Sequence, residues 1–312
     1  MERIVTFDIL KGFGIILMIV AHTYGPGNML WNFIYAFHIP LFFIVTGYFY
    51  KERPIQQLLT KNIKQLLIPY IAMCFIIVIL TQIRQPHNIK TDISYIFNGM
   101  GPGWFLLALF LVRIFFHYIL YAFKDKYLVM SLLLSTSISI IAYYYNMSSF
   151  LSFFPSLLSL FFVAFGYYIR VHSILEHDYK HPIIILTISI LCWLLTSYYG
   201  QVEMSQCIFK LSVIDFCGSI GGTYIIFRLS QMIDQKQGLL NKTLLYAGRN
   251  SIVILFFHSI DYCVPFWHQI EPFFPSSIFL FVVLAIRFLF VSACVFFTLH
   301  SKHLRTFFVS NK

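Results

Sequence analysis

The stretch FHIPLFFIVTGYFYKERP, residues 37–54, decides the fold class of this chain. It is an almost uninterrupted apolar run that ends in charged residues, as a membrane helix does where it meets water. It also carries His38, Pro40 and the pair Thr46 and Gly47, at positions where a helix that only contacts lipid would use leucine. The stretch therefore predicts a membrane helix with polar features that need an explanation.

The composition of the whole chain supports a membrane protein. Of its 312 residues, 59% are hydrophobic and 11% charged, and 36 are Phe and 20 Tyr. Soluble domains carry about 25% charged residues, so a soluble domain of this length could not bury so much apolar surface. No cysteine pair or histidine spacing typical of a metal site is present, and we expect no metal.

Apolar runs recur along the chain and predict an all-α polytopic membrane protein, a single bundle of about ten transmembrane helices. No linker separates a second domain, so residues 1–312 are expected to form one integral-membrane domain. The expected spans are Thr6–His22, Leu30–Tyr50, Leu66–Ile83, Gly103–Phe123, Leu128–Asn146, Phe150–Arg170, Pro182–Gly200, Ile208–Leu229, Ser251–Trp267 and Ser276–His300.

The positions of the basic residues predict the orientation. With the N-terminus inside, sixteen of the 22 Lys and Arg residues fall in inner segments and two, Arg84 and Lys90, in outer ones. This is a strong positive-inside bias, and it predicts that both termini are cytoplasmic. It also accounts for the net charge of +10 without a nucleic-acid partner.

Several ionisable residues lie within the expected spans, where lipid would penalise them. Such residues usually face a cavity or pair with each other across helices. Asp8 and Lys11, at i and i+3, can pair on the first helix. The others are Arg113, Lys210, Asp215, His258, Asp261 and Arg287.

His22 and His38 form the most suggestive pair. His22 closes the first span and His38 lies early in the second, so both fall in the outer half of the membrane on neighbouring antiparallel helices. A single buried histidine is more often a hydrogen-bonding residue than a catalyst, but two on adjacent helices make the two interpretations about equally well supported. Neutral imidazole is well suited to take a proton from a hydroxyl.

A second feature lies on the inner side, where KERPIQQLLTKNIKQLLIPY, residues 51–70, forms an amphipathic stretch. Lys61 and Lys64, at i and i+3, share one face of the expected helix. They can anchor the helix to lipid phosphates or meet the phosphates of a cytoplasmic ligand. Spacing alone favours the lipid anchor.

Five stretches in this order resemble the acyltransferase-3 family of membrane acyltransferases. Their sequences resemble most the branch of the family that contains fucose 4-O-acetylases and related polysaccharide acetylases. The stretches are RIVTFDILKGFGIILMIVAHT (residues 3–23), FHIPLFFIVTGYFY (37–50), KNIKQLLIPY (61–70), GPGWFLLALF (101–110) and LLYAGRNSIVILFFH (244–258).

The resemblance implies transfer of an acyl group, usually acetyl, from cytoplasmic acyl-CoA to a hydroxyl of a surface or exported polysaccharide or glycolipid sugar. It implies His22 and His38 as catalytic residues and Lys61 and Lys64, with Arg53, as contacts for the donor. The family usually has arginines in place of Lys61 and Lys64. Expected supporting residues are Asp8, Lys11, Trp104, Thr46 and Gly47.

Taken together, these features predict that His22, assisted by His38, is the general base for the acceptor hydroxyl; alternatively, it carries the acetyl group covalently. Asp8 lies about 21 Å from His22 along a helix, so another element must orient the histidine. Asp261, Asp92 and Glu203 are candidates that the sequence does not rank. The expected location is the cell (inner or plasma) membrane, with membrane lipids as further partners.

A transporter or flippase of a glycan precursor is the competing interpretation, since such proteins also have many spans and interrupted helices. It predicts corresponding interruptions in two halves of the chain, and Pro40 has no evident counterpart.

Overall fold

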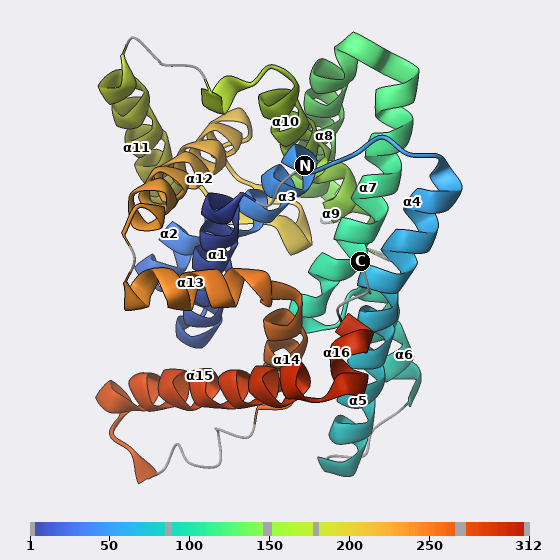
Figure 1. Cartoon of the computed structure of the whole chain (residues 1–312), viewed down its shortest axis with the longest axis vertical. Helices are drawn as coiled ribbons and strands as arrows, with labels where there is room; N and C mark the ends of the chain where they lie inside the picture. The colour runs from blue at the N-terminus through green and yellow to red at the C-terminus, as the bar shows by residue number, and fades with distance from the viewer. Residues whose placement is uncertain are drawn as a thin grey trace.

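The computed structural model describes residues 4–84, 89–145, 152–176, 181–236, 238–265 and 273–308. These residues form a helical bundle with one small two-stranded hairpin (Figure 1).

The longer helices are α1 (Val5–Tyr24), α5 (Ile68–Arg84), α7 (Trp104–Phe123), α8 (Tyr127–Tyr145), α11 (Pro182–Tyr199), α12 (Val213–Asp234) and α15 (Ser276–His300). The shorter helices are α2 (Met29–Tyr35), α3 (His38–Tyr48), α4 (Ile55–Asn62), α6 (Ile89–Asn98), α9 (Phe153–Leu158), α10 (Leu160–Val171), α13 (Leu239–Arg249), α14 (Ser251–Cys263) and α16 (Lys302–Phe308). The hairpin pairs β1 (Val202–Glu203) with β2 (Ile208–Phe209) in antiparallel register.

Seven helical stretches of the described chain are long and apolar enough to cross a membrane. One of them, residues 93–142, contains α7 and most of α8 and therefore covers most of two expected spans. The prediction of a helical, multi-pass membrane protein is thus confirmed, while the count of ten and the cytoplasmic placement of the termini remain predictions.

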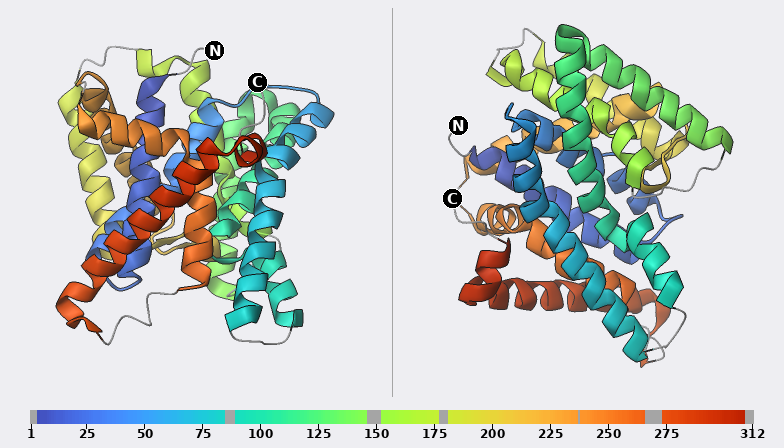
Figure 2. Two further views of the ribbon diagram at one scale, coloured as in Figure 1. Left: turned by 60° about the horizontal axis from the view of Figure 1, so that its bottom comes forward. Right: turned by 90° about the vertical axis from the view of Figure 1, so that its right-hand side faces the viewer.

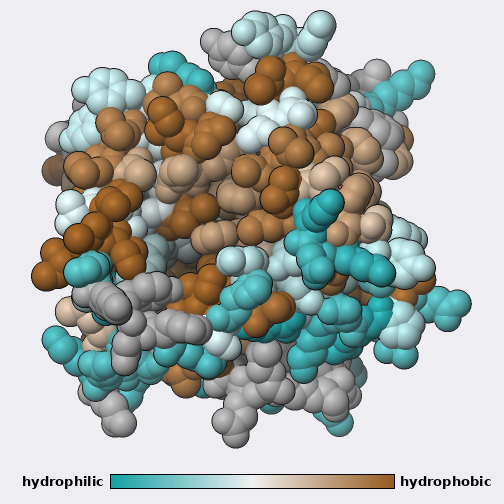
Figure 3. Space-filling model, turned by 90° about the horizontal axis from the view of Figure 1, so that it is seen from above, coloured by the Kyte–Doolittle hydropathy of each residue, from teal (hydrophilic) through white to brown (hydrophobic). Residues whose placement is uncertain are grey.

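The bundle has two distinct ends. The start of α1 and the short α16 lie toward the same end, at the top of the left view in Figure 2. On the face drawn in Figure 3, hydrophobic side chains cover the upper and middle parts and hydrophilic ones gather along the lower edge. This banding is what a membrane-embedded surface with a polar rim requires.

The second expected span, Leu30–Tyr50, is interrupted. Helix α2 ends at Tyr35, Ala36 and Phe37 form a turn, and α3 begins at His38. A proline inside a helix can open it, but here the interruption precedes both His38 and Pro40. Pro40 lies in the first turn of α3, where its missing N–H has no helical partner to lose. The break therefore places His38 at a helix start.

The third expected span, Leu66–Ile83, begins earlier than predicted. Helices α4 and α5 are joined through a π-helical turn, Ile63–Leu67, so one helical stretch of 30 residues runs from Ile55 to Arg84. Lys61 lies in the last turn of α4 and Lys64 in the π turn. A π turn holds one more residue per hydrogen-bonded loop than an α turn and often occurs at functional sites.

The eighth expected span, Ile208–Leu229, starts too early. Residues 202–209 form the hairpin, and α12 begins only at Val213. Its second strand, Ile208–Phe209, was predicted as the start of an apolar helix, because strands and helices cannot be separated by hydrophobicity in so short a run. The expected ends at Asn146, Phe150 and Trp267 lie outside the described residues.

Two helix crossings depend on reciprocal glycines. A Cβ at Gly47 would lie 1.9 Å from the backbone oxygen of Val163, and one at Gly166 would lie 2.0 Å from that of Ile44. The same pattern joins α1 to α13, through Gly12 and Gly248. Glycine lets these backbones approach to a distance that no side chain would permit, as is common between membrane helices. Both crossings fix helices that carry residues of the site described next.

Candidate active site

A cavity of about 510 Å³ lies between α1, α3, α4, α7, α14 and the hairpin. Its lining includes Lys11 and His22 of α1, which are separated by about 16 Å along the helix axis at 1.5 Å per residue. The cavity therefore follows α1 through much of the bundle. Its lining changes along this path from basic to aromatic and histidine-rich.

His22 lies in the last turn of α1 and lines the cavity. Its Nδ1 is 2.9 Å from Nε2 of His258 on α14, with the two rings inclined by only 12°. The ring of Tyr35 has its centroid 6.0 Å from that of His22, and the ring of Tyr262 is 5.0 Å away. The second nitrogen of His22, Nε2, makes no hydrogen bond to a described residue and is left for a ligand.

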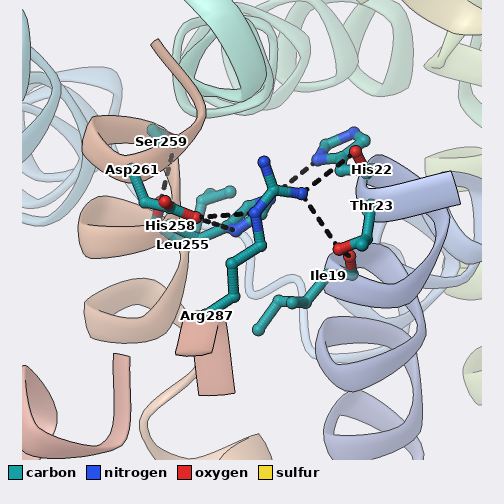
Figure 4. A network of polar contacts seen from close by, with 8 residues as sticks. All are labelled: Ile19, His22, Thr23, Leu255, His258, Ser259, Asp261 and Arg287. Carbon is teal, nitrogen blue, oxygen red and sulfur yellow. Dashed lines mark hydrogen bonds and ion pairs between the residues drawn. The ribbon is translucent and has the colours of Figure 1, made fainter. Parts of the chain in front are cut away.

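Behind His258 lies a buried ion pair (Figure 4). Nδ1 of His258 is 3.7 Å from Oδ2 of Asp261, and the same carboxylate oxygen is 3.2 Å from Nε of Arg287 on α15. Arg287 extends from α15 to α1, where Nη1 donates to the backbone oxygen of His22 at 3.1 Å and to Oγ1 of Thr23 at 2.9 Å. Three helices are thus tied together around His22.

His38 also lines the cavity and is fully buried. Its Nδ1 donates to the backbone oxygen of Ile34 at 3.0 Å, because a carbonyl can only accept. In the neutral ring Nε2 is then the unprotonated nitrogen, and Nε2 has no hydrogen-bond partner among the described residues. The ring packs on Tyr35, with centroids 4.7 Å apart. His38 therefore presents an acceptor near His22.

The other part of the cavity is basic. Lys51, Arg53 and Lys61 line it, and all three are at least partly exposed, so the cavity reaches the surface here. Arg113 of α7 adds a partly buried guanidinium whose Nη1 donates to Oδ1 of Asn62 at 3.1 Å. Four cations in one opening suit a ligand with several negative charges.

Seven of the ten predicted site residues line the cavity. These are His22, His38, Arg53, Lys61, Lys11, Thr46 and Trp104.

The other three predicted residues lie elsewhere. Lys64 lies outside the cavity but shares a second, shallower hollow with Arg53 and Lys61. Asp8 and Lys11 form the expected pair, with Nζ 2.7 Å from Oδ1, and Nε of Arg249 is 3.6 Å from the other Asp8 oxygen. Gly47 packs against α10, as described above.

The sequence did not identify the functional importance of His258, Arg287, Arg113 or Tyr35. In the sequence, His258, Arg287 and Arg113 stood out only as ionisable residues within expected spans. His258 is also the last residue of one of the quoted stretches, residues 244–258. Which of them share a site depends on contacts between segments more than 200 residues apart, as between His22 and His258.

Glu203 of the hairpin lines the cavity on the side of the histidines. Its Oε1 accepts from Oγ of Ser205 at 2.6 Å. Burial raises the pKa of this carboxyl above its ordinary value, while the hydrogen bonds from Ser205 oppose the shift. Among the described residues, no group of three or more His, Cys, Asp or Glu could hold a metal ion.

The fold and the site define a helical membrane protein with one cavity, which has a basic entrance and is lined by His22, whose ring is hydrogen-bonded to His258. A family model described as an acyltransferase domain (acyltransferase-3) matches residues 4–304, nearly the whole chain. The chain belongs to this family, and it is a membrane acyltransferase. Searches of the curated proteins and of the solved structures return no match.

Proposed function

We propose that this protein is an O-acetyltransferase, which moves the acetyl group of cytoplasmic acetyl-CoA to a hydroxyl of a polysaccharide or lipid-linked sugar. The observation that carries the proposal is the single cavity that His22 and His38 share with Arg53, Lys61 and Arg113. This arrangement suits a donor that binds with its charged head at the basic entrance and its reactive end near the histidines.

The donor's chemistry suits both parts of the cavity. Acyl-CoA carries phosphates at one end, which lysine and arginine bind through charge-assisted hydrogen bonds. Its pantetheine arm is thin and largely uncharged, which suits the apolar middle of the cavity, where Ile15, Met18 and Phe105 lie. The thioester at the end of the arm then lies near His22.

The acceptor sugar occupies the opposite part of the cavity in this proposal. Tyr35 and Trp104 offer aromatic faces there, and Glu203 offers a carboxylate that accepts hydrogen bonds from hydroxyl groups. Sugar rings carry apolar faces and hydroxyl edges, so this combination suits them. By the predicted topology, the hairpin with Glu203 lies on the outer side of the cell (inner or plasma) membrane, where an exported glycan is available.

The chemistry is a direct transfer. Nε2 of His22 takes the proton of the acceptor hydroxyl as the oxygen attacks the thioester carbon. The C–S bond breaks, and the thiolate of CoA leaves with the proton returned by the His22 imidazolium. Nε2 of His38, an acceptor, helps to hold the acceptor hydroxyl near His22.

The test uses the purified full chain in nanodiscs with acetyl-CoA labelled in the acetyl group and a panel of neutral and acidic glycans. The proposal expects release of CoA and transfer of label to a glycan that depends on the protein. A glycan moved across a liposome membrane by this protein without any acetyl transfer would contradict the proposal and support the transporter.

A further inference from the structure

The contacts behind His22 raise the question of which of its two nitrogens carries the proton. A general base needs an unprotonated nitrogen facing its substrate, and neutral imidazole has one such nitrogen. If His22 carries its proton on Nε2, it cannot take one from a hydroxyl in the cavity. The tautomer therefore decides whether His22 is a base or a donor.

We infer that Asp261 and His258 hold His22 in the tautomer that leaves Nε2 free, and we assign both as positioning residues for the proposed transfer. The inference rests on the proposed role of His22 as base. It starts from a group whose hydrogen-bonding character is fixed, since an ionised carboxylate can only accept.

The proton positions follow in order from this carboxylate. Asp261 favours a proton on Nδ1 of His258 through its negative charge, because its Oδ2 is 3.7 Å from that nitrogen, a distance longer than a hydrogen bond. Nε2 of His258 is then unprotonated and accepts from Nδ1–H of His22 across 2.9 Å. The remaining nitrogen of His22, Nε2, is thereby the unprotonated one. Reversing any step puts a proton on the catalytic atom.

Arg287 gives the arrangement its rigidity. A buried carboxylate is costly to maintain as an ion without a positive partner, and Nε of Arg287 is 3.2 Å from Asp261. The same guanidinium binds the backbone oxygen of His22 and the hydroxyl of Thr23. Figure 4 shows it bridging α14 and α1. The carboxylate of Asp261 and the backbone of His22 are therefore held by the same cation.

This arrangement also selects among the orienting groups that the sequence left open. Asp261 reaches His22 through His258, whereas no hydrogen bond joins Glu203 to either histidine in the described chain. The side chain of Asp92 lies outside the described residues.

The test compares Asp261→Asn, His258→Leu and His258→Gln in the full chain. An amide at 261 can donate toward His258 and so permits the wrong tautomer, and leucine at 258 removes the acceptor. Glutamine places an amide where Nε2 of His258 lies and can still accept from His22. Groups that orient a metal-bound histidine through its second nitrogen are worth about 10- to 100-fold in activity, and we take the same range for this metal-free histidine. We expect Asp261→Asn and His258→Leu to lower kcat by that factor with an unchanged KM for acetyl-CoA, and His258→Gln to recover much of it.

Ser259→Ala is the matched control. Ser259 is buried beside His258 on α14, but its hydroxyl donates to the backbone oxygen of Leu255 and takes no part in the chain of contacts. We expect normal kcat from this variant. Protein yield, monodispersity and melting temperature in nanodiscs identify a variant that fails to fold.

A second readout does not depend on transfer activity. Nitrogen-15 NMR of histidine-labelled protein separates the two neutral tautomers by chemical shift, and His22→Gln identifies the His22 signals. We expect the Nδ1–H tautomer at His22 in the wild type and its loss in Asp261→Asn. The Nε2–H tautomer in the wild type, or an unchanged tautomer in Asp261→Asn, overturns the inference even if the protein proves to be an active transferase. The expected tautomers with no transferase activity would instead contradict only the proposed function.

Discussion

Nε2 of His38 is a buried polar atom without a hydrogen-bond partner in the described ranges. Leaving such an atom unsatisfied costs about 1–3 kcal/mol, so a ligand that donates to it gains affinity. We expect His38→Phe to lower kcat/KM about 10- to 100-fold for the acceptor while the protein folds normally. Steady-state kinetics with a glycan acceptor check this. An unchanged kcat/KM would make His38 a structural residue.

Glu203 predicts a specific dependence of stability on pH. Its pKa is raised by burial, so the folded state pays for ionising the carboxyl as pH rises through the folded pKa. Glu203→Gln removes this cost, because the amide stays neutral. We therefore expect the variant to melt at a higher temperature than the wild type at pH 8. Near pH 4 the two proteins should melt at about the same temperature, because the Glu203 carboxyl of the wild type is then largely neutral in both the folded and the unfolded chain.

Thermal unfolding in nanodiscs at several pH values measures the difference. A melting temperature for Glu203→Gln that falls below that of the wild type at pH 8 would mean that the ionised carboxylate stabilises the fold.

At the scale of elements, the crossing of α3 and α10 is the contact most sensitive to added volume. A methyl group at Gly47 would meet backbone atoms, which cannot move aside as the end of a side chain can. We expect Gly47→Ala to destabilise the protein by about 1–3 kcal/mol, the usual cost of overpacking. Gly238→Ala is the control, since a Cβ there meets nothing within 4 Å. Equal melting temperatures for both variants would contradict the close packing.

The helices were largely predictable from the sequence, because long apolar runs such as Thr6–His22 and Leu128–Asn146 can satisfy their backbone in lipid only as helices. The hairpin at residues 202–209 and the turn at Ala36 and Phe37 were not. The hairpin lies in a short apolar segment and the turn lies inside the long apolar span Leu30–Tyr50, and in both places tertiary contacts decide the backbone conformation. The π turn at Ile63–Leu67 likewise leaves no mark in hydrophobicity.

The candidate site was predictable only in part. His22, His38 and Lys61 could be found because polar residues stand out in apolar helices and the quoted stretches contain them. The contacts of His22 with His258 and of Arg287 with α1 join the two ends of the chain, and no spacing in the sequence encodes them.

At the scale of the whole molecule, the cavity distinguishes two lysines that the sequence treats alike. Lys61 lines it and Lys64 does not. A hydrogen bond to a charged group is worth about 1.5–3 kcal/mol, so we expect Lys61→Ala to raise the KM for acetyl-CoA about tenfold or more. Lys64→Ala is the matched control. It should change the KM for acetyl-CoA by less than about threefold, which corresponds to less than about 0.7 kcal/mol. A larger increase of this KM in Lys64→Ala than in Lys61→Ala would place the donor's phosphates in the second, shallower hollow.

The proposed transfer depends on His22 as the base that acts between the two ends of the cavity. General-base catalysis contributes about 10²- to 10⁴-fold. The most direct test is the rate of acetyl transfer from labelled acetyl-CoA to a glycan by purified wild type and His22→Ala at equal protein levels. We predict a loss of at least about 100-fold with acetyl-CoA binding retained. A loss of about tenfold or less would contradict the central claim.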